Sequence, residues 1–336
     1  MSRVAIIGAG AWGTGLAMVL GRKKVHAVRL WANEVDVCES ISQRRVNERF
    51  LPGFSLPDSV EATNDLFKAL EGAEIVVSVM PSQHCRSLFE RMASSLGPEM
   101  TFVSCTKGLE DGTLFRMTEV IADVMRTRKF TPRVGALSGP SFAKEVARGD
   151  PTAVTIASTD SELARTVQEA FNDSRFRVYT NDDVIGVELG GALKNIIAIA
   201  AGVCAGLGLG HNSVAALITR GLAEIARLTV ACGGRLDTMA GLAGLGDLVL
   251  TCTGDLSRNR SVGVELGKGR KLSDIIADMH GAVAEGVLTT KAAVGLARKK
   301  GVEMPITEQM YAILENGKPP QRAIEDLMTR AAKREA

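Results

Sequence analysis

Two lysines and an aspartate lie in surroundings where their side chains could act on a small anionic substrate. Lys194 stands in an apolar helical stretch, Leu189–Ile197, where loss of water disfavours the ammonium form and lowers the pKa. Such an amine suits a general base near neutral pH, although a lysine can also extend its charge from a packed helix into solvent. Asp247 has apolar neighbours too, so it could orient Lys194, accept a substrate hydroxyl or cap a helix. Lys107 follows an apolar strand and could reach an anion there or remain a solvated loop residue.

Two further segments carry groups that could hold an anion. Ser257-Arg258-Asn259-Arg260 is predicted to be a loop, in which arginine offers paired donors with the geometry of a phosphate and asparagine adds an amide donor. The alternative is a solvated basic turn. The second segment, Ser138–Ala143, follows a strand and enters a helix. Gly139 there allows close approach of the backbone, and the Ser141 hydroxyl could bond a substrate oxygen, cap the helix, or do both.

The segment Gly8-Ala9-Gly10-Ala11-Trp12-Gly13 follows a strand and opens a helix, which is the context of a dinucleotide-binding loop. The first glycine permits the tight turn, the second lets a pyrophosphate approach, and the third lets the helix pack against the strand. The helix N-terminus then presents free N–H groups to the phosphates. An acidic residue is expected about 20 residues further on to hold the ribose hydroxyls. Glu34 stands there, where it could equally begin the next helix.

Apolar runs of strand length alternate with helical patterns in the first half of the chain. We expect strands at Val4–Ile7, Ala27–Trp31, Glu74–Met80, Thr101–Cys105, Val134–Ser138, Ala153–Ala157 and Phe176–Tyr179. We expect helices between them, among others at Trp12–Gly21, Gln83–Leu96, Thr113–Met125 and Ser161–Phe171. Because several strands are apolar throughout, they are expected to be buried on both faces. The alternation predicts a parallel sheet with right-handed crossovers and helices on both faces.

After about residue 185, long helical periodicities replace this pattern. The expected helices include Leu189–Ala205, Ser213–Cys232, Ala292–Lys300 and Ala323–Ala332. Residues 186–254 hold 14 of the 35 glycines, against 13 in the first 185 residues, which indicates close helix packing or backbone near a ligand. The fold class is therefore α/β: an N-terminal Rossmann-like doubly wound sheet at 1–185, then an all-helical C-terminal domain at 186–336.

Composition and charge exclude several classes of protein. A chain of 336 residues with 46% hydrophobic and 23% charged residues is typical of a soluble globular protein. With a net charge of +2, nothing favours binding to nucleic acid or an anionic membrane. The longest uncharged apolar run, Ile196–Gly210, is shorter than a spanning helix, and no secretory signal precedes the first strand, so we expect a cytoplasmic protein. The six cysteines and four histidines are scattered, which predicts reduced thiols and no metal site.

The chain resembles the bacterial NAD(P)-dependent glycerol-3-phosphate dehydrogenases over essentially its whole length. The segments that carry the resemblance, in the family's order, are GAGAWGTGLA (8–17), FLPG (50–53), CTKGLE (105–110), LSGPSFAKEVA (137–147), GVELGGALKNIIAIAAG (186–202), GLAGLGDLVLTCT (241–253), SRNR (257–260), AEG (284–286) and GVEMPIT (301–307). Such a set is more specific than any single motif.

The resemblance implies roles for individual residues. Lys194, beside Asn195, matches the proton acceptor. Substrate contacts are implied for Lys107, Gly139, Ser141, Lys194, Asp247, Ser257, Arg258 and Asn259. Cofactor contacts are expected at Gly8, Gly10, Ala11, Trp12, Gly13, Asn33, Lys107, Ala143, Arg258, Val283 and Glu285, with NAD or NADP as the cofactor.

The turn after the second expected strand departs from the family. Many members carry arginine or histidine two residues beyond the tryptophan that is here Trp31, and that basic group can pair with the 2′-phosphate of NADPH. This chain has Asn33 followed by Glu34. A carboxylate near the ribose accepts bonds from the hydroxyls of NAD and repels a phosphate. The nearest basic residues are Arg29, Arg44 and Arg45. We therefore predict that NADH is used at least as well as NADPH.

The sequence thus predicts an oxidoreductase that reversibly transfers a hydride between NAD(P)H and dihydroxyacetone phosphate, supplying sn-glycerol 3-phosphate for glycerophospholipid synthesis. A dehydrogenase of the same build acting on a hydroxy acid or sugar acid is the nearest alternative, but it would leave Ser257–Arg260 unexplained. A non-catalytic nucleotide-sensing module would leave Lys194 without a role. A helical second domain is compatible with a homodimer and does not require one.

Overall fold

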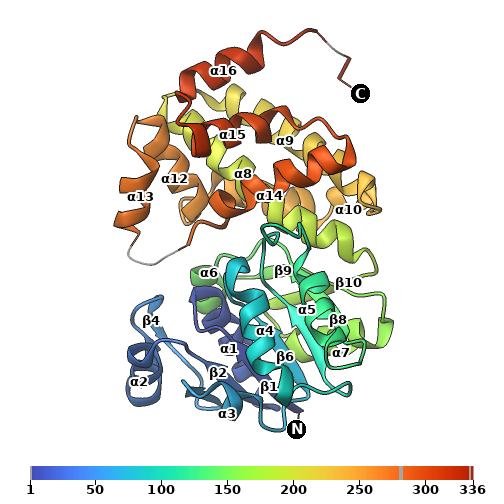
Figure 1. Cartoon of the computed structure of the whole chain (residues 1–336). Coiled ribbons are helices and arrows are strands. Elements are labelled where there is room, and N and C mark those ends of the chain that lie inside the picture. The colour runs from blue at the N-terminus through green and yellow to red at the C-terminus, as the bar shows by residue number, and fades with distance from the viewer. Residues whose placement is uncertain (1, 280–282, 333, 336) are drawn as a thin grey trace.

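The chain forms an α/β domain and a helical domain, which lie one above the other in the computed structural model (Figure 1). The structure describes residues 2–279, 283–332 and 334–335. The N-terminal domain is built on an eight-stranded sheet with the order β10-β9-β8-β7-β6-β1-β2-β5. Its strands are β1 (Ser2–Ile7), β2 (His26–Trp31), β5 (Val60–Thr63), β6 (Ile75–Ser78), β7 (Thr101–Ser104), β8 (Arg133–Ser138), β9 (Thr152–Ala157) and β10 (Phe176–Asn181). Taken in order along the chain, β5-β2-β1-β6-β7-β8 is the 3-2-1-4-5-6 arrangement of dinucleotide-binding domains.

The expected strands all overlap strands of the structure, and three short ones were missed. These are β5 and the two strands of a separate hairpin, β3 (Val46–Asn47) and β4 (Leu51–Ser55). A strand of two residues has no periodicity to detect, and β5 reads Val-Glu-Ala-Thr, which is too short and too polar for a buried run.

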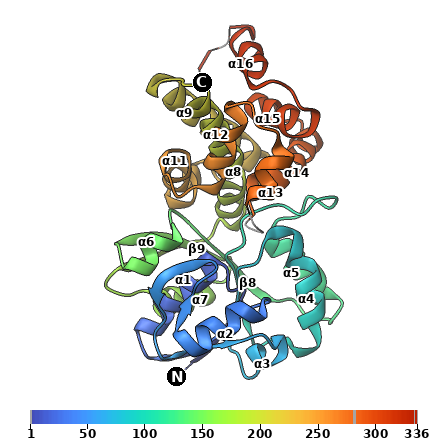
Figure 2. The same ribbon diagram turned by 90° about the vertical axis from the view of Figure 1, so that its left-hand side faces the viewer.

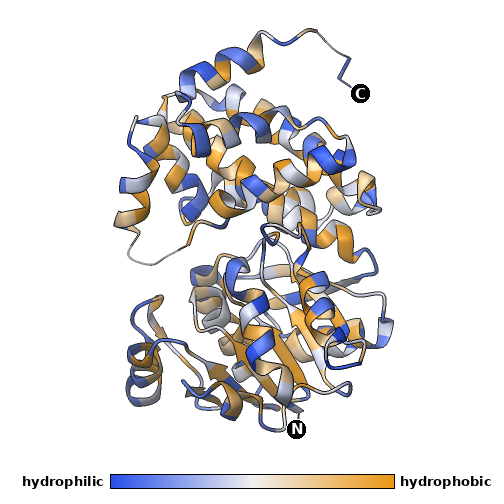
Figure 3. Cartoon of the chain, in the orientation of Figure 1, coloured by the Kyte–Doolittle hydropathy of each residue, from blue (hydrophilic) through white to orange (hydrophobic). Residues whose placement is uncertain are grey.

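Helices cover both faces of the sheet because alternate strand residues point to opposite sides. Val4 and Ile6 of β1 share one core with α1 (Ala11–Arg22), α6 (Ala143–Arg148) and α7 (Ser161–Phe171). Ala5 and Ile7 share the other with α3 (Leu66–Leu70), α4 (Cys85–Met92) and α5 (Met117–Arg126). Figure 2 shows α1 and α7 on one side and α4 and α5 on the other. Helix α2 (Val35–Arg44) packs against β5, the last strand at one end of the sheet. The apolar strands stand out between these layers in Figure 3.

The expectation of a wholly parallel sheet is wrong at one pair, because β9 runs antiparallel to β8. The connection between them contains α6, which has six residues. At 1.5 Å per residue such a helix spans only about 9 Å, whereas a strand of this length spans about 20 Å. The chain therefore does not return to the starting edge, and β9 begins at the edge where β8 ends.

The second domain is helical, as expected, and is arranged around α8 (Val184–Gly206). The remaining helices are α9 (His211–Ala231), α10 (Leu236–Met239), a π-helical turn at Leu242–Gly246, α11 (Asp247–Thr253), α12 (Arg258–Gly267), α13 (Leu272–Asp278), α14 (Glu285–Lys300), α15 (Pro305–Asn316) and α16 (Pro320–Met328). Helix α8 is long and apolar enough to cross a membrane by length and composition, but 89% of its apolar window is buried inside the protein. It packs against α9, α11, α12 and α14 and is the core helix of this domain.

The glycines of α8 and α12 let the two helices meet backbone to backbone. A Cβ atom on Gly263 would lie 1.9 Å from the carbonyl oxygen of Ile199, and one on Gly202 would lie 2.0 Å from that of Arg260. Close helix packing therefore accounts for part of the glycine density in this region. The expectation of a loop at Ser257–Arg260 is wrong, because Ser257 is the N-cap of α12 and the next three residues form its first turn.

Replacing Gly263 tests this packing. Gly263→Ala is expected to lower the free energy of unfolding by at least about 2–3 kcal/mol, because a backbone carbonyl cannot move aside as a side chain can. Gly210→Ala is the control, since a Cβ atom there meets nothing within 4 Å and φ is −78°. It should change stability by no more than about 1 kcal/mol. Urea unfolding at pH 7 measures both, and equal small effects would contradict backbone contact between α8 and α12.

Candidate functional site

The groups predicted to act on a substrate lie together where the carboxyl ends of β7 and β8 face α8 and α11. Asp247, the first residue of α11, is 1% exposed, and its carboxylate lies between two lysines. Lys107, which follows β7, donates to Oδ2 of Asp247 at 2.6 Å. Lys194, buried in α8, donates to Oδ1 of the same carboxylate. A single buried acid thus joins a lysine from each domain.

Burial and neighbouring charges shift the titration of this triad. Burial lowers the pKa of Lys194 to about 7; the Asp247 carboxylate opposes this shift, and the Lys107 ammonium adds to it. Burial alone would raise the pKa of Asp247, but the ammonium groups of Lys107 and Lys194 outweigh it and hold that pKa below its usual range. Near neutral pH, therefore, the Lys194 amine can both accept and release a proton while Asp247 stays ionised.

Thr251 completes the surroundings of Lys194 and was missed in the sequence. Lys194 Nζ donates to Thr251 Oγ1 at 2.7 Å, and this hydroxyl in turn donates to the backbone carbonyl of Asp247 at 2.6 Å. Thr251 lies four residues after Asp247, which puts both side chains on one face of α11. This spacing of four residues in a helical stretch was the signal in the sequence that could have indicated Thr251 as a partner of Asp247. The two residues fix the position of the Lys194 amine.

The turn after β8 faces Lys107. Lys107 Nζ donates to the carbonyl oxygen of Gly139 at 3.2 Å, and Ser141 Oγ donates to the same oxygen at 2.9 Å. The suggestion that Ser141 caps the following helix is wrong, since the N-cap of α6 is Phe142 and Ala143 is its first residue. Ser141 is therefore held at the turn beside Lys107.

The N-terminus of α12 brings Ser257, Arg258 and Asn259 to the same region. Asn259 Nδ2 donates to Oδ1 of Asn195, the neighbour of Lys194, at 3.0 Å. Asn259 Oδ1 accepts from the backbone N–H of Gly286 at 2.9 Å, and Ser257 Oγ accepts from the N–H of Arg260. These bonds hold the first turn of α12 against α8 and α14.

The two arginines of this turn differ in their surroundings. Arg260 Nη1 pairs with the exposed Asp255 at 3.1 Å. The Arg258 side chain is solvent-exposed, yet enough protein surrounds it that desolvation lowers its pKa, with the Glu285 carboxylate opposing the shift. Arg258 is thus the arginine available to an anion.

The glycine loop fits a dinucleotide. Gly8 has φ of +123°, and a Cβ atom there would lie 2.6 Å from the carbonyl oxygen of Val79. A Cβ atom on Gly13 would lie 1.9 Å from the carbonyl oxygen of Gly8, so the loop and α1 are in backbone contact. At Gly10, by contrast, a Cβ atom would meet nothing within 4 Å. The loop is therefore tightly packed at Gly8 and Gly13 and open at Gly10. Next to this open space, the start of α1 (Ala11, Trp12) offers free N–H groups.

Beyond the loop, the turn after β2 and the start of α14 carry the remaining predicted cofactor contacts. Asn33 is exposed, and Glu34 is the N-cap residue of α2 with no capping bond from its side chain. Val283 is half-buried. Glu285, the first residue of α14, accepts from Ser82 Oγ at 2.7 Å and from the Ser82 N–H at 3.2 Å. Glu285 thus reaches across from the helical domain to the 3-10 turn (Ser82–His84) that follows β6.

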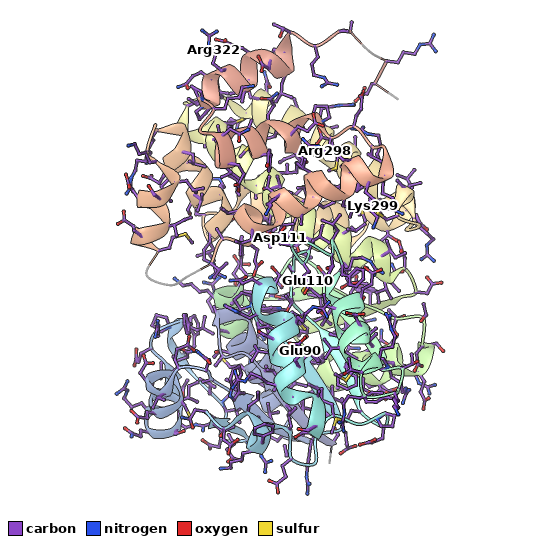
Figure 4. The ribbon with its side chains drawn as sticks, viewed as in Figure 1. Glu90, Glu110, Asp111, Arg298, Lys299 and Arg322 are labelled. Carbon is purple, nitrogen blue, oxygen red and sulfur yellow. The ribbon has the colours of Figure 1, made fainter. Side chains whose placement is uncertain are left out.

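The loop after β7 also spans the two domains. Leu109 packs in the core of the helical domain, and Asp111 pairs with Lys291 of α14 at 2.9 Å. Figure 4 shows Glu110 and Asp111 at the junction of the domains. At the end of this loop, Arg116 donates to Glu188 of α8 at 2.6 Å. Lys107 therefore begins a segment that is anchored in the opposite domain.

The cysteines are free thiols, as expected. Within residues 2–279, 283–332 and 334–335, no three His, Cys, Asp or Glu side chains are grouped so as to hold a metal ion.

Comparison with known proteins identifies relatives over the whole chain. Residues 3–164 match the family described as NAD-dependent glycerol-3-phosphate dehydrogenase N-terminus, and residues 183–325 match the corresponding C-terminus. A glycerol-3-phosphate dehydrogenase of the NAD(P)+ type from Koribacter versatilis is 69% identical over 330 residues, which is 98% of each chain. One from Acidobacterium capsulatum is 56% identical and covers 100% of each chain. The crystal structure of glycerol-3-phosphate dehydrogenase from Coxiella burnetii, 42% identical, superposes with a TM-score of 0.92 over 98% of this chain and 99% of that one.

Proposed function

The chain belongs to the NAD-dependent glycerol-3-phosphate dehydrogenase family, and from this premise we propose how its residues perform the reaction. It is an oxidoreductase that uses NAD(P) and interconverts sn-glycerol 3-phosphate and dihydroxyacetone phosphate, supplying the former for glycerophospholipid synthesis. This identity excludes a hydroxy-acid dehydrogenase and a nucleotide sensor.

We propose that Lys194 moves the proton. When dihydroxyacetone phosphate is reduced, the Lys194 ammonium donates a proton to the oxygen at C2, and during oxidation the neutral Nζ takes the proton of the C2 hydroxyl. The nicotinamide supplies or accepts the hydride when it is bound. The observation that carries this proposal is the buried Asp247 carboxylate between Lys107 and Lys194, together with the Lys194 pKa of about 7.

Lys107 and the turns after β8 and before α12 are proposed to hold the substrate. Lys107, Gly139 and Ser141 would bind one side of it, and Ser257, Arg258 and Asn259 would bind the phosphate. The guanidinium of Arg258 supports this assignment because the residue is exposed, whereas the guanidinium of Arg260 is paired with Asp255. Asp247 would hold the amines of Lys107 and Lys194 in fixed positions beside the substrate.

The glycine loop is proposed to hold the cofactor. Gly8, Gly10 and Gly13, with the free N–H groups of Ala11 and Trp12, would bind the pyrophosphate. Further contacts are assigned to Asn33, Lys107, Ala143, Arg258, Val283 and Glu285. The open space above Gly10 and the exposure of Asn33 support this assignment.

Domain limits, assembly and location complete the proposal. We infer two functional units, at 1–185 and 186–336, and a cytoplasmic protein without nucleic-acid or membrane partners. The net charge of +2 and the burial of α8 within the protein support this. A homodimer is proposed as well. The exposed start of α9, residues 211–216, carries no Asp, Glu, Lys or Arg, which suits a contact between copies.

Opposite pH profiles in the two directions would test the role of Lys194. Reduction needs the ammonium form and should slow as pH rises above about 7, whereas oxidation needs the neutral amine and should slow as pH falls below about 7. Asp247→Asn removes a charge that raises the Lys194 pKa, so the pH at which each of the two rates declines should become lower. Lys194→Ala should lose about 10²–10⁴-fold in kcat, with the Kd for NADH unchanged. Near-full turnover by folded Lys194→Ala would refute the assignment.

Phosphate recognition is tested with paired arginine variants. Arg258→Ala should raise the KM for dihydroxyacetone phosphate about 10- to 100-fold, since a hydrogen bond to a charged group contributes roughly 1.5–3 kcal/mol. Arg260→Ala is the matched control and should leave this KM nearly unchanged, because Arg260 pairs with Asp255. Unphosphorylated dihydroxyacetone should be a very poor substrate. If wild type uses both ketones comparably, the start of α12 is not a phosphate site.

Cofactor choice depends on the turn after β2. Two of the three arginines nearest to it are engaged elsewhere: Arg29 with Glu61 and Glu71, and Arg45 with backbone carbonyl groups. The third, Arg44, donates to Ser40 Oγ of its own helix at 3.1 Å. We therefore expect kcat/KM with NADH to equal or exceed that with NADPH. The double variant Asn33→Arg/Glu34→Ala should shift the ratio toward NADPH. A strong preference of the wild type for NADPH would contradict this prediction.

A further inference from the structure

A buried asparagine outside the assigned site makes hydrogen bonds to the glycine loop and to the helix that follows it. Asn47 lies in β3 of the separate hairpin and is 0% exposed. Its Nδ2 donates to the carbonyl oxygen of Ala9 at 2.8 Å and to Thr14 Oγ1 at 2.8 Å. Its Oδ1 accepts from the backbone N–H of Phe50 at 3.0 Å. Because an N–H can only donate, the contact with Phe50 fixes which end of the amide faces the loop.

The bond to Ala9 determines the direction of the next N–H group. The carbonyl of Ala9 and the N–H of Gly10 belong to one planar peptide unit, and no peptide bond in the described chain is cis. In a trans peptide these two groups point in opposite directions. A carbonyl held inward by Asn47 therefore aims the N–H of Gly10 outward, to the side where a Cβ atom on Gly10 would meet nothing within 4 Å.

This peptide unit needs such a restraint because glycine follows it. Gly10 adopts positive and negative φ with similar ease, so rotation of the Ala9–Gly10 unit would meet little steric resistance. The rotated unit would present the Ala9 carbonyl dipole to an anion in place of an N–H donor. Thr14 Oγ1 also donates to the Ala9 carbonyl, but at 3.4 Å.

We propose that Asn47 is a positioning residue for cofactor binding, which holds the Ala9–Gly10 peptide so that its N–H faces the pyrophosphate. The proposal rests on the proposed function, in that the ligand is a dinucleotide. The hairpin β3–β4 is then a support for the loop as well as a connection between α2 and β5. The substrate groups around Lys194 should be unaffected by the loss of Asn47.

Titration of the full-length enzyme with NADH, followed by calorimetry, tests the proposal. Asn47→Ala removes every bond of the amide, whereas Asn47→Asp keeps an oxygen for Phe50 and loses the donor to Ala9. Both variants should raise the Kd for NADH about tenfold or more. They should raise the KM for NADH equally and leave the KM for dihydroxyacetone phosphate unchanged. Thr14→Val, which keeps the bond from Asn47 to Ala9, should raise the Kd for NADH by a smaller factor.

Ser40→Ala is the matched control for the hairpin. Ser40 is buried and donates to the carbonyl of Val46 at 2.7 Å, so it secures β3 beside Asn47 without touching the loop. This variant should bind NADH as the wild type does. A Kd for NADH unchanged in the Asn47 variants, or raised equally in Ser40→Ala, would overturn the proposal. Because Kd is measured on folded molecules, partial unfolding alters the number of sites and leaves the value readable. Asn47→Asp, which retains the bond from Phe50, provides the test if Asn47→Ala does not fold. Failure of the wild type to oxidise NADH with dihydroxyacetone phosphate would instead refute the proposed function.

Discussion

The burial of one carboxylate between two lysines is the constraint on which the arrangement of the domains depends. Asp247 is almost inaccessible, and a buried charge without partners is very costly. Its partners come from both domains: Lys107 follows a strand of the sheet, and Lys194 lies in the core helix of the second domain. If the domains were separated, Asp247 and Lys194 would lose Lys107. The site is therefore complete only when the two domains are in contact.

Several contacts around the site hold the domains in that relation. Leu109 continues the segment that begins at Lys107 and packs in the helical core. Glu188 of α8 accepts hydrogen bonds from Arg116 and from both the N–H and the hydroxyl of Thr118. Glu285 accepts a hydrogen bond from Ser82 in the turn after β6. Each contact joins a residue of one domain to a residue of the other. Lys194 and the glycine loop thus keep a defined separation.

Backbone contact between α8 and α12 sets the positions of the groups that we propose to bind the phosphate. Because Gly202 and Gly263 bring α8 and α12 together, Asn259 reaches Asn195, the residue next to Lys194. The N–H of Gly286 then bonds Asn259 and ties in the start of α14. Arg258 stands at the open end of this packed cluster. A change in the α8–α12 distance would therefore move the residues of the proposed phosphate site even if none of those residues were replaced.

The sequence by itself determined the features that are encoded locally. The alternation of apolar strands and helices predicts the α/β domain, the glycine loop between β1 and α1 predicts a dinucleotide, and the apolar stretch around Lys194 predicts a lowered pKa. These signals lie within a few residues of one another, so they can be seen without the fold. The tertiary structure alone decided the antiparallel direction of β9 and the helical start of α12. It also decided the partners Ser82 and Asn47. Their hydrogen bonds join segments far apart in the chain, and such pairs leave no local pattern because packing of whole elements brings them together.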